Sequence, residues 1–223
     1  MQKFDTAAAI TAVLDVPAGR ILFIAADRAD TTVEIRPADA SKRRDVKTAE
    51  QTTVEYGDGV LRIEAAAGKN RLLGPTGAVE VTVKLPVGSH VEAKASATEL
   101  RGVGRLGDIA FEGAYRHIKI DEAARVRLTA VDGDVEVGRL AGPAEISTTR
   151  GDIRIAEATT GKVVLRTQSG DITVAAAAGA SASLDAGTGF GRIQNSLKNA
   201  DGSAAGLNIQ ATTEYGDIAA RSL

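Results

Sequence analysis

An aspartate that recurs after a glycine is the clearest candidate for chemistry in this sequence. Asp134, Asp152 and Asp171 follow one another at steps of 18 and then 19 residues, and each is preceded by glycine. A column of carboxylates could bind Ca²⁺ between neighbouring rungs, because calcium takes carboxylate oxygens as ligands. A structural role explains the pair more simply, since glycine supplies a positive φ at a corner and aspartate closes an Asx turn by accepting the backbone N–H two residues on. We therefore expect corners rather than a metal site, and no cofactor.

The same corner recurs beyond these three aspartates. Gly191 is followed by Arg192 where the other corners carry aspartate, which argues against an obligatory row of metal ligands. The residues predicted to form structural corners are Gly133, Asp134, Gly151, Asp152, Gly170, Asp171, Gly191, Gly216 and Asp217.

Other residues that could support catalysis are sparse. The chain has no cysteine and only two histidines, His90 and His117, each flanked by strand-like residues, so surface or edge positions are expected for both. No G-x-S-x-G or H-E-x-x-H pattern is present. The basic run from Lys42 to Arg44 has acidic neighbours, and a solvated helix face explains it better than a phosphate site. We expect no enzymatic activity.

A glycine-containing segment from Lys69 to Gly77 raises the possibility of a phosphate-binding loop. It lacks the G-x-x-x-x-G-K-[ST] pattern, and no helical pattern follows it. The segment therefore predicts a hairpin tip.

Composition narrows the class of function. The 223 residues carry 27 Lys and Arg against 29 Asp and Glu, a formal net charge of −2, whereas nucleic-acid and anionic-membrane binders concentrate basic charge. Aromatic residues make up only 3%, and sugar-processing sites usually offer aromatic platforms. The first residues lack the apolar run of a signal peptide, and no segment has the length of a membrane span. These features predict a cytoplasmic protein that reaches a membrane, if at all, through a partner.

The first 90 residues alternate apolar and polar side chains in short segments, as half-buried strands do. A turn at Pro17 to Gly19 separates the first two. The strands are expected at 11–16, 20–25, 31–36 and 79–85.

Between these strands the sequence predicts one helix and one hairpin. Residues 39–51 contain neither glycine nor proline and predict a short helix, with Asp39 or Ser41 as its N-cap. Asp58-Gly59 between alternating runs predicts a hairpin over 53–64.

From about residue 90 the sequence repeats itself. Three segments align without a gap, at 126–137, 144–155 and 163–174, and each is a strand, a Gly-Asp corner and a strand. A period of about 18 to 20 residues with a glycine corner is typical of a β-solenoid, in which each coil stacks on the next. We predict an all-β fold: a single-stranded β-solenoid over residues 91–223, with residues 1–90 as a hairpin-rich capping part of the same domain that includes one short helix.

The repeat continues in both directions. Backward steps from the first aligned corner reach His117 and then Glu99, which keep the strand pattern without Gly-Asp. Forward steps of 21 and 25 residues reach Arg192 and then Asp217 as successive coils. A loop over Asn195 to Gly206 accounts for the longer step.

Alternation within each strand assigns the side chains to the interior or to solvent. Glu136, Arg154 and Thr173 are expected to point outward, and Glu136 could pair with Arg154 on the next coil. The inward ladders are expected to contain Val135, Val137, Ile153, Ile155, Ile172 and Val174.

The corner motifs resemble those of one known family. The T-x-x-G-D-I sequence at 148–153, the S-G-D-I sequence at 169–172 and the closing G-D-I at 216–218 resemble the DUF4097 family of β-strand-repeat proteins, which are labelled as candidate adhesins and grouped with the toastrack-type domains. V-P-A-G at 16–19 and L-P-V-G at 85–88 extend the resemblance over nearly the whole chain. The resemblance implies the fold and implies no catalytic residues.

Together these observations predict a non-enzymatic β-solenoid scaffold or protein-interaction module. Its expected partner is another protein or a second copy of the chain, with no nucleic acid and no direct insertion into a membrane. The alternative is a carbohydrate-binding or carbohydrate-active β-helix protein of adhesin-like character.

Overall fold

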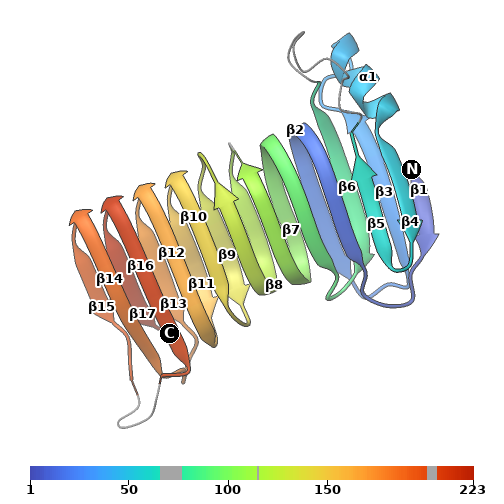
Figure 1. Ribbon diagram of the computed structural model, residues 1–223. Helices are drawn as coiled ribbons and strands as arrows, with labels where there is room; N and C mark the ends of the chain where they lie inside the picture. Colours follow the sequence, from blue (N-terminus) through green and yellow to red (C-terminus); the bar gives the residue numbers. More distant parts are fainter. Residues whose placement is uncertain (66–76, 115, 200–204) are drawn as a thin grey trace.

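The computed structural model describes residues 1–65, 77–114, 116–199 and 205–223. Over these residues the chain winds into an elongated stack of coils, with the N-terminal strands at one end and the C-terminal coils at the other (Figure 1). The 17 strands join in one hydrogen-bonded sheet. The predicted all-β solenoid is confirmed, but the loop expected at Lys69 to Gly77 lies, apart from its last residue, outside the described residues.

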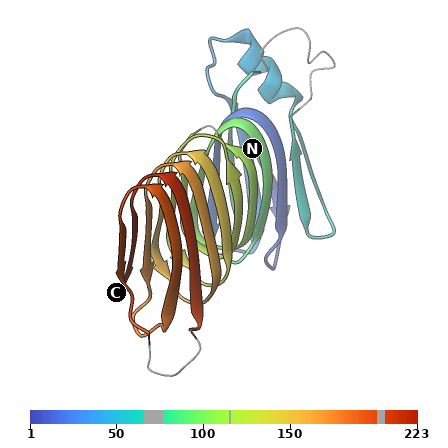
Figure 2. The ribbon, with the colours of Figure 1, turned by 60° about the vertical axis from the view of Figure 1, so that its left-hand side comes forward.

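The strands form two opposed faces of a flattened coil, here called face A and face B (Figure 2). Face A runs, in spatial order, through β4 (Thr53–Gly57), β5 (Val60–Glu64), the first part of β2 (Thr11–Ala26), two parts of β7 (His90–Ala114), the second part of β8 (Ile118–Ala130), β10 (Ala144–Arg150), β12 (Gly161–Ser169), β16 (Leu207–Tyr215) and β14 (Ala182–Phe190). Face B runs through β1 (Gln2–Asp5), β3 (Asp30–Pro37), β6 (Val79–Pro86), the second part of β2, the middle of β7, the first part of β8, β9 (Val135–Leu140), β11 (Ile153–Ala158), β13 (Ile172–Ala176), β17 (Ile218–Ser222) and β15 (Ile193–Ser196).

The register predicted from the repeat is confirmed. On face B, Ile153 pairs with Val135 on one side and with Ile172 on the other. Parallel strands in register place like side chains above one another, so each coil buries the apolar residues of its neighbours. The predicted inward residues Val135, Val137, Ile153, Ile155, Ile172 and Val174 are all 0–1% exposed.

Parallel pairing of strands begins within the first 90 residues, before the predicted start of the solenoid at residue 91. β2 pairs with β7 along both faces, from Thr11 opposite His90 to Ile24 opposite Val103. The turn expected near Pro17 is therefore a corner between two faces of one coil, where Gly19 has a φ of +128°. A complete coil thus exists before the boundary that was drawn at residue 90.

The helix α1 (Arg43–Gln51) begins later than predicted. Asp39 is not its cap, because its Oδ1 accepts hydrogen bonds from the backbone N–H and the hydroxyl of Ser41, at 2.9 and 2.6 Å. The N-cap position belongs to Lys42, which makes no side-chain cap bond. Asp45 fastens the helix to the sheet, since it is buried and accepts the N–H of Ala78 at 3.0 Å. No helix of the described residues is long and apolar enough to cross a membrane.

The N-terminal end of the stack is closed by aromatic side chains. β4 and β5 form the predicted hairpin, with positive φ at Asp58 and Gly59. The rings of Phe4, on β1, and Tyr56, on β4, lie 5.4 Å apart and pack partly buried against the core. These rings cover interior residues that would otherwise meet solvent.

The last two coils stack in the opposite order to the one predicted. β16 and β17 lie directly beside β12 and β13, and β14 and β15 form the outermost coil. The coil that comes earlier in the sequence is therefore the outermost one, and the last coil of the sequence lies between it and the rest of the stack. The interior explains this order: at one inward position the inner coil carries Ala220, which is buried, whereas the outer coil carries the polar Asn195. Part of the expected loop, residues 200–204, lies outside the described residues.

Candidate functional site

The Gly-Asp corners form a column of hydrogen bonds along one edge of the stack. Asp134 Oδ1 accepts the backbone N–H of Asp152 at 2.9 Å, and Asp152 Oδ1 accepts that of Asp171 at 2.8 Å. In the same way, Asp171 Oδ1 accepts the backbone N–H of Asp217 at 2.7 Å, and Asp217 Oδ1 accepts that of Arg192 at 2.8 Å. The predicted Asx turn within one corner was wrong, because each carboxylate reaches the equivalent residue of the next coil. The predicted structural role of the corner is retained.

At three of the corners, a threonine three residues before the corner glycine adds a second bond between coils, which the sequence did not predict. Thr167 Oγ1 donates to the carbonyl of Gly151 at 3.2 Å, and Thr213 Oγ1 donates to that of Gly170 at 3.0 Å. Thr188 makes the same bond in the outermost coil. At the Gly151 corner, Thr148 Oγ1 instead donates to the carbonyl of Arg150 in its own coil at 3.0 Å. The signal for these residues is T-x-x-G, which recurs at 148–151, 167–170, 188–191 and 213–216.

The corner glycines are required by crowding as well as by backbone conformation. Gly151 has a φ of +122°, and a Cβ atom added there would overlap the carbonyl oxygen of Gly133 on the preceding coil. The same clash would occur between Gly170 and Gly151. Side chains at these positions would push neighbouring coils apart.

The column ends in an ion pair. The Nη2 atom of Arg192 lies 3.0 Å from Asp217 Oδ2. The backbone N–H of Arg192, and then its guanidinium, hold the pKa of the Asp217 carboxyl below its usual value. Arginine suits this slot because the outermost coil has no further coil to which a carboxylate could bond.

The candidate calcium column of Asp134, Asp152 and Asp171 has the geometry of a structural element. One oxygen of each carboxylate already accepts a backbone N–H. Within the described ranges, no group of three or more His, Cys, Asp or Glu side chains is placed to hold a metal ion. The Oδ1 atom of each of the three carboxylates is therefore directed at the backbone of the next coil.

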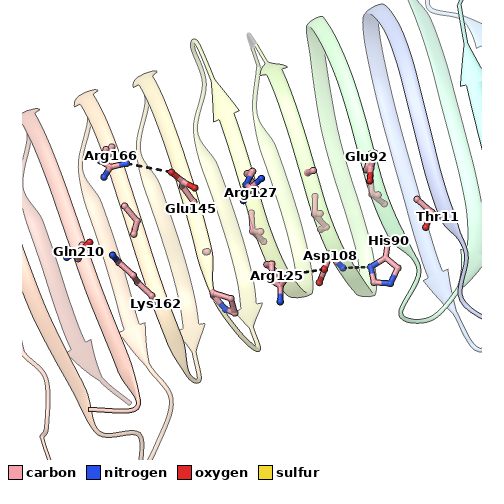
Figure 3. Close-up of a pocket in the computed structure, with 17 residues that line it drawn as sticks. Thr11, His90, Glu92, Asp108, Arg125, Arg127, Glu145, Lys162, Arg166 and Gln210 are labelled. Carbon is pink, nitrogen blue, oxygen red and sulfur yellow. Dashed lines mark hydrogen bonds and ion pairs between the residues drawn. The ribbon is translucent and has the colours of Figure 1, made fainter. Parts of the chain in front are cut away.

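A shallow groove crosses the outer side of face A (Figure 3). It has a volume of about 880 Å³ and is lined by residues of β2, β7, β8, β10, β12 and β16. The compact side chains of Ala110 and Pro143 leave space between longer side chains. A second, smaller hollow of about 170 Å³ adjoins it and shares Val164, Arg166 and Gln210 with its lining.

Both signs of charge line this groove. Its cations are Arg125, Arg127, Lys162 and Arg166, and its anions are Glu92, Asp108 and Glu145. Arg125 Nη1 lies 3.5 Å from Asp108 Oδ2, and Arg166 Nη1 lies 3.8 Å from Glu145 Oε1 (Figure 3). Among the residues that the structure describes, Arg127 forms no ion pair, and neither does Lys162. Two cations of the groove are thus left for a ligand.

The two histidines occupy edge positions, as expected. His90 lies in the groove, and its Nδ1 accepts the backbone N–H of Asp108 at 2.9 Å. His117 occupies the column slot that precedes Asp134, and its Nε2 lies 3.9 Å from Glu136 Oε2. They lie on different faces and do not form a common site.

Two groups of charged surface residues, around Glu136 and from Lys42 to Arg44, were also considered in the sequence. Arg154 lies opposite Glu136 on the next coil, as expected, but the hydrogen bond of Glu136 is made elsewhere: its Oε2 accepts from Lys119 Nζ at 2.9 Å. This bond, with smaller contributions from nearby charges that include Arg154, lowers the pKa of Glu136. The basic run from Lys42 is exposed, and Lys42 Nζ lies 3.0 Å from Asp39 Oδ2. This run is a solvated surface, as expected.

Comparison with protein families settles the relationship of the chain. The family described as Toastrack DUF4097 matches residues 13–222. The chain belongs to the Toastrack DUF4097 family. The matched span of this Toastrack protein contains the whole corner column and all but one of the residues that line the groove.

Three solved structures resemble the Toastrack chain at low identity. A candidate cell adhesion protein from Clostridium sporogenes is 12% identical, with 100% of this chain and 98% of that chain covered and a TM-score of 0.39. Candidate adhesins from Bacteroides fragilis and Parabacteroides distasonis are each 13% identical, with 98% of this chain and 95% of theirs covered and TM-scores of 0.47. No curated protein matches the Toastrack chain.

Proposed function

We propose that this protein is a non-enzymatic β-solenoid scaffold that binds a protein partner through the groove on face A. The observation that carries the proposal is the groove itself, which crosses six strands and presents fixed charges of both signs. Its walls belong to strands that are hydrogen-bonded on both sides, so the charges are held at regular intervals by a rigid frame.

The chemistry of the lining favours a polypeptide as the ligand. Neighbouring strands lie about 4.8 Å apart, so the charged side chains repeat at a spacing that an extended peptide with polar side chains can match. Electrostatic complementarity of mixed charges gives an interface its specificity. A nucleic acid would instead favour cations without the intervening Glu92, Asp108 and Glu145.

The groove offers little to an enzyme or to a sugar ring. The Nδ1 atom of its one histidine accepts a backbone N–H, which removes that nitrogen as a general base. No Phe, Tyr or Trp is among the residues that line the groove, and aromatic rings are the usual platforms for sugars. Both observations support an interaction role.

A charge-reversal variant with a matched control tests this function. Arg127→Glu changes an unpaired, exposed cation in the groove, whereas Arg154→Glu changes an exposed arginine on the opposite face by the same charge. The wild-type protein and both variants would be immobilised and used to capture proteins from native extract, with quantitative mass spectrometry. We expect a specific protein to be retained by wild type and Arg154→Glu and reduced at least about tenfold by Arg127→Glu. Equal capture by all three would contradict the proposal.

The carbohydrate alternative has its own observation and test. Phe190 and Tyr215 are exposed on the outer surface with their rings stacked 5.1 Å apart, and exposed aromatic rings bind sugars. A glycan array would reveal a specific carbohydrate ligand. Binding that is lost in Phe190→Ala and kept in Arg127→Glu would replace the groove proposal with a lectin-like function.

A further inference from the structure

The C-terminal end of the stack gathers exposed apolar side chains. Most of the large hydrophobic residues that are exposed in the described ranges belong to the last two coils or to the residue that follows them. The six are Met1, Val131, Phe190, Ile193, Tyr215 and Leu223, and the last four of these lie at this end. Exposed apolar clusters on soluble proteins mark interaction sites.

One inward ladder shows that the end coil is incompletely covered. Ile153, Ile172 and Ile218 occupy the same position on successive coils and are at most 1% exposed. Ile193 continues this ladder on β15 and is 45% exposed. A further layer stacked on this end would bury Ile193 as its equivalents are buried.

The strands at this end lack the charges that usually protect an edge. β14 contains one charged residue, Asp185, and β15 contains none. At the opposite end, the edge strands β1 and β4 carry Lys3, Asp5 and Glu55, and aromatic rings close the interior. Unprotected strand edges pair with other strands, so the two ends of the molecule differ in their capacity for association.

The shape of the end limits what can cover it. β14 and β15 are the edge strands of two opposed faces at the C-terminal end (Figure 1). On β14, Ala182 belongs to the core, and Leu184 and Ala186 pack partly buried against it. A single added peptide strand would pair with one face and leave the other exposed. An occupant that covers both must itself present two edge strands with an apolar interior between them, and the C-terminal end of a second copy does so.

We propose that two copies of this chain associate through their C-terminal ends, with the edge strands of one copy paired to those of the other across a two-fold axis. An axis perpendicular to the faces brings β14 against β14 and β15 against β15 in antiparallel pairs, an isologous contact. A pairing of β14 centred on Ala186 or Gly187 places Asp185 opposite glycine, so no like charges meet. The contact is independent of the groove on face A and of what binds there.

Solution mass measurement tests the association. By light scattering coupled to size-exclusion chromatography, the wild-type chain of 23.0 kDa should shift to twice that mass as its concentration rises. Gln194→Lys, on exposed β15, brings like charges together across the two-fold axis and should raise the dimer dissociation constant at least about tenfold. Ile193→Lys, which places a charge at the uncovered ladder position, should do the same. Gln168→Lys, exposed on an inner coil, is the matched control and should leave the constant unchanged.

Cross-linking locates the contact, because the chain has no native cysteine. Gln194→Cys should form a disulfide-linked dimer under mild oxidation, whereas Glu55→Cys at the opposite end should not. A strict monomer at every concentration would overturn the proposal. So would chains longer than a dimer formed by the double variant Gln194→Cys with Glu55→Cys through links between positions 194 and 55, which indicate head-to-tail stacking. Arg127→Glu should dimerise normally, so failure of the groove proposal and failure of this one give different results.

Discussion

At the scale of single residues, the corner aspartates act between coils rather than within them. Asp171 Oδ1 accepts the N–H of Asp217 on the next coil, and Thr167 of the same corner motif donates to the carbonyl of Gly151 on the preceding coil. Hydrogen bonds to a charged acceptor are stronger than those between neutral groups. At this corner the T-x-x-G-D motif therefore makes two connections in opposite directions, one through its threonine and one through its aspartate.

Gly151→Ala should destabilise the protein because of both crowding and backbone conformation. The added Cβ would overlap the carbonyl oxygen of Gly133 at a φ of +122°, and we expect a loss of about 2 to 3 kcal/mol in the free energy of unfolding. Gly57→Ala is the matched control, since no atom lies within 4 Å of a Cβ added there and its φ is not positive. Urea unfolding would measure both variants. Equal midpoints would show that the corners do not need glycine.

The acid sensitivity of the column end follows from the lowered pKa of Asp217. A carboxyl whose pKa is lower in the folded state stabilises the fold above its unfolded-state value of about 3.9, and this stabilisation is lost as pH falls through the folded-state pKa. Arg192→Gln keeps the backbone donor and removes the cation, so it should raise the pKa of Asp217 partway towards the unfolded value. Carbon-13 NMR titration would measure this change. An unchanged pKa would mean that the ion pair has no effect in solution.

At the scale of coils and strands, the sequence predicts the register between paired strands better than the spatial order in which the coils stack. The aligned corners specify which residues of two coils lie side by side, so the pairing of Ile153 with Ile172 could be predicted. The same alignment fits any sequence of stacking, because strands at 182–190 and 207–215 match the repeat equally well. Two features carried the information on order: the polar Asn195 at an inward position and the longer step before the last corner.

Engineered disulfides can test the order of the last coils. Arg166, Thr212 and Gly187 lie in one outward row on β12, β16 and β14. Neighbouring strands are about 4.8 Å apart, within the Cα separation that a disulfide spans, and next-nearest strands are about twice as far. The double variant Arg166→Cys with Thr212→Cys should oxidise to an internal disulfide, and Arg166→Cys with Gly187→Cys should not. The reverse result would indicate sequential stacking.

The groove could not be predicted, although some of its residues, such as Arg127, Glu145 and Arg166, lie in predicted strands. Its lining combines side chains from strands that are one or more periods apart, such as Asp108, Arg125 and Lys162. Listing the outward positions of the repeat by row would have placed these charges together. The hollow itself depends on side-chain volume at Ala110 and Pro143, which periodicity does not report.

At the scale of the whole molecule, the two proposed binding surfaces are separate. The groove lies on face A, and the uncovered coil lies at the C-terminal end. The proposed two-fold axis keeps face A of both copies on the same side, so a dimer would present two grooves to one partner or to a repetitive one. Linked sites of this kind bind more tightly than either site alone when both can be engaged.

The central claim is that this solenoid acts through a binding surface on face A, and site-specific photo-cross-linking tests it most directly. p-Benzoylphenylalanine would replace Ala110 inside the groove or Arg154 on the opposite face, both exposed positions. After irradiation in native extract, the account predicts a discrete covalent adduct with another protein from position 110 and none from position 154. Identical adducts from both positions, or none from position 110, would contradict it.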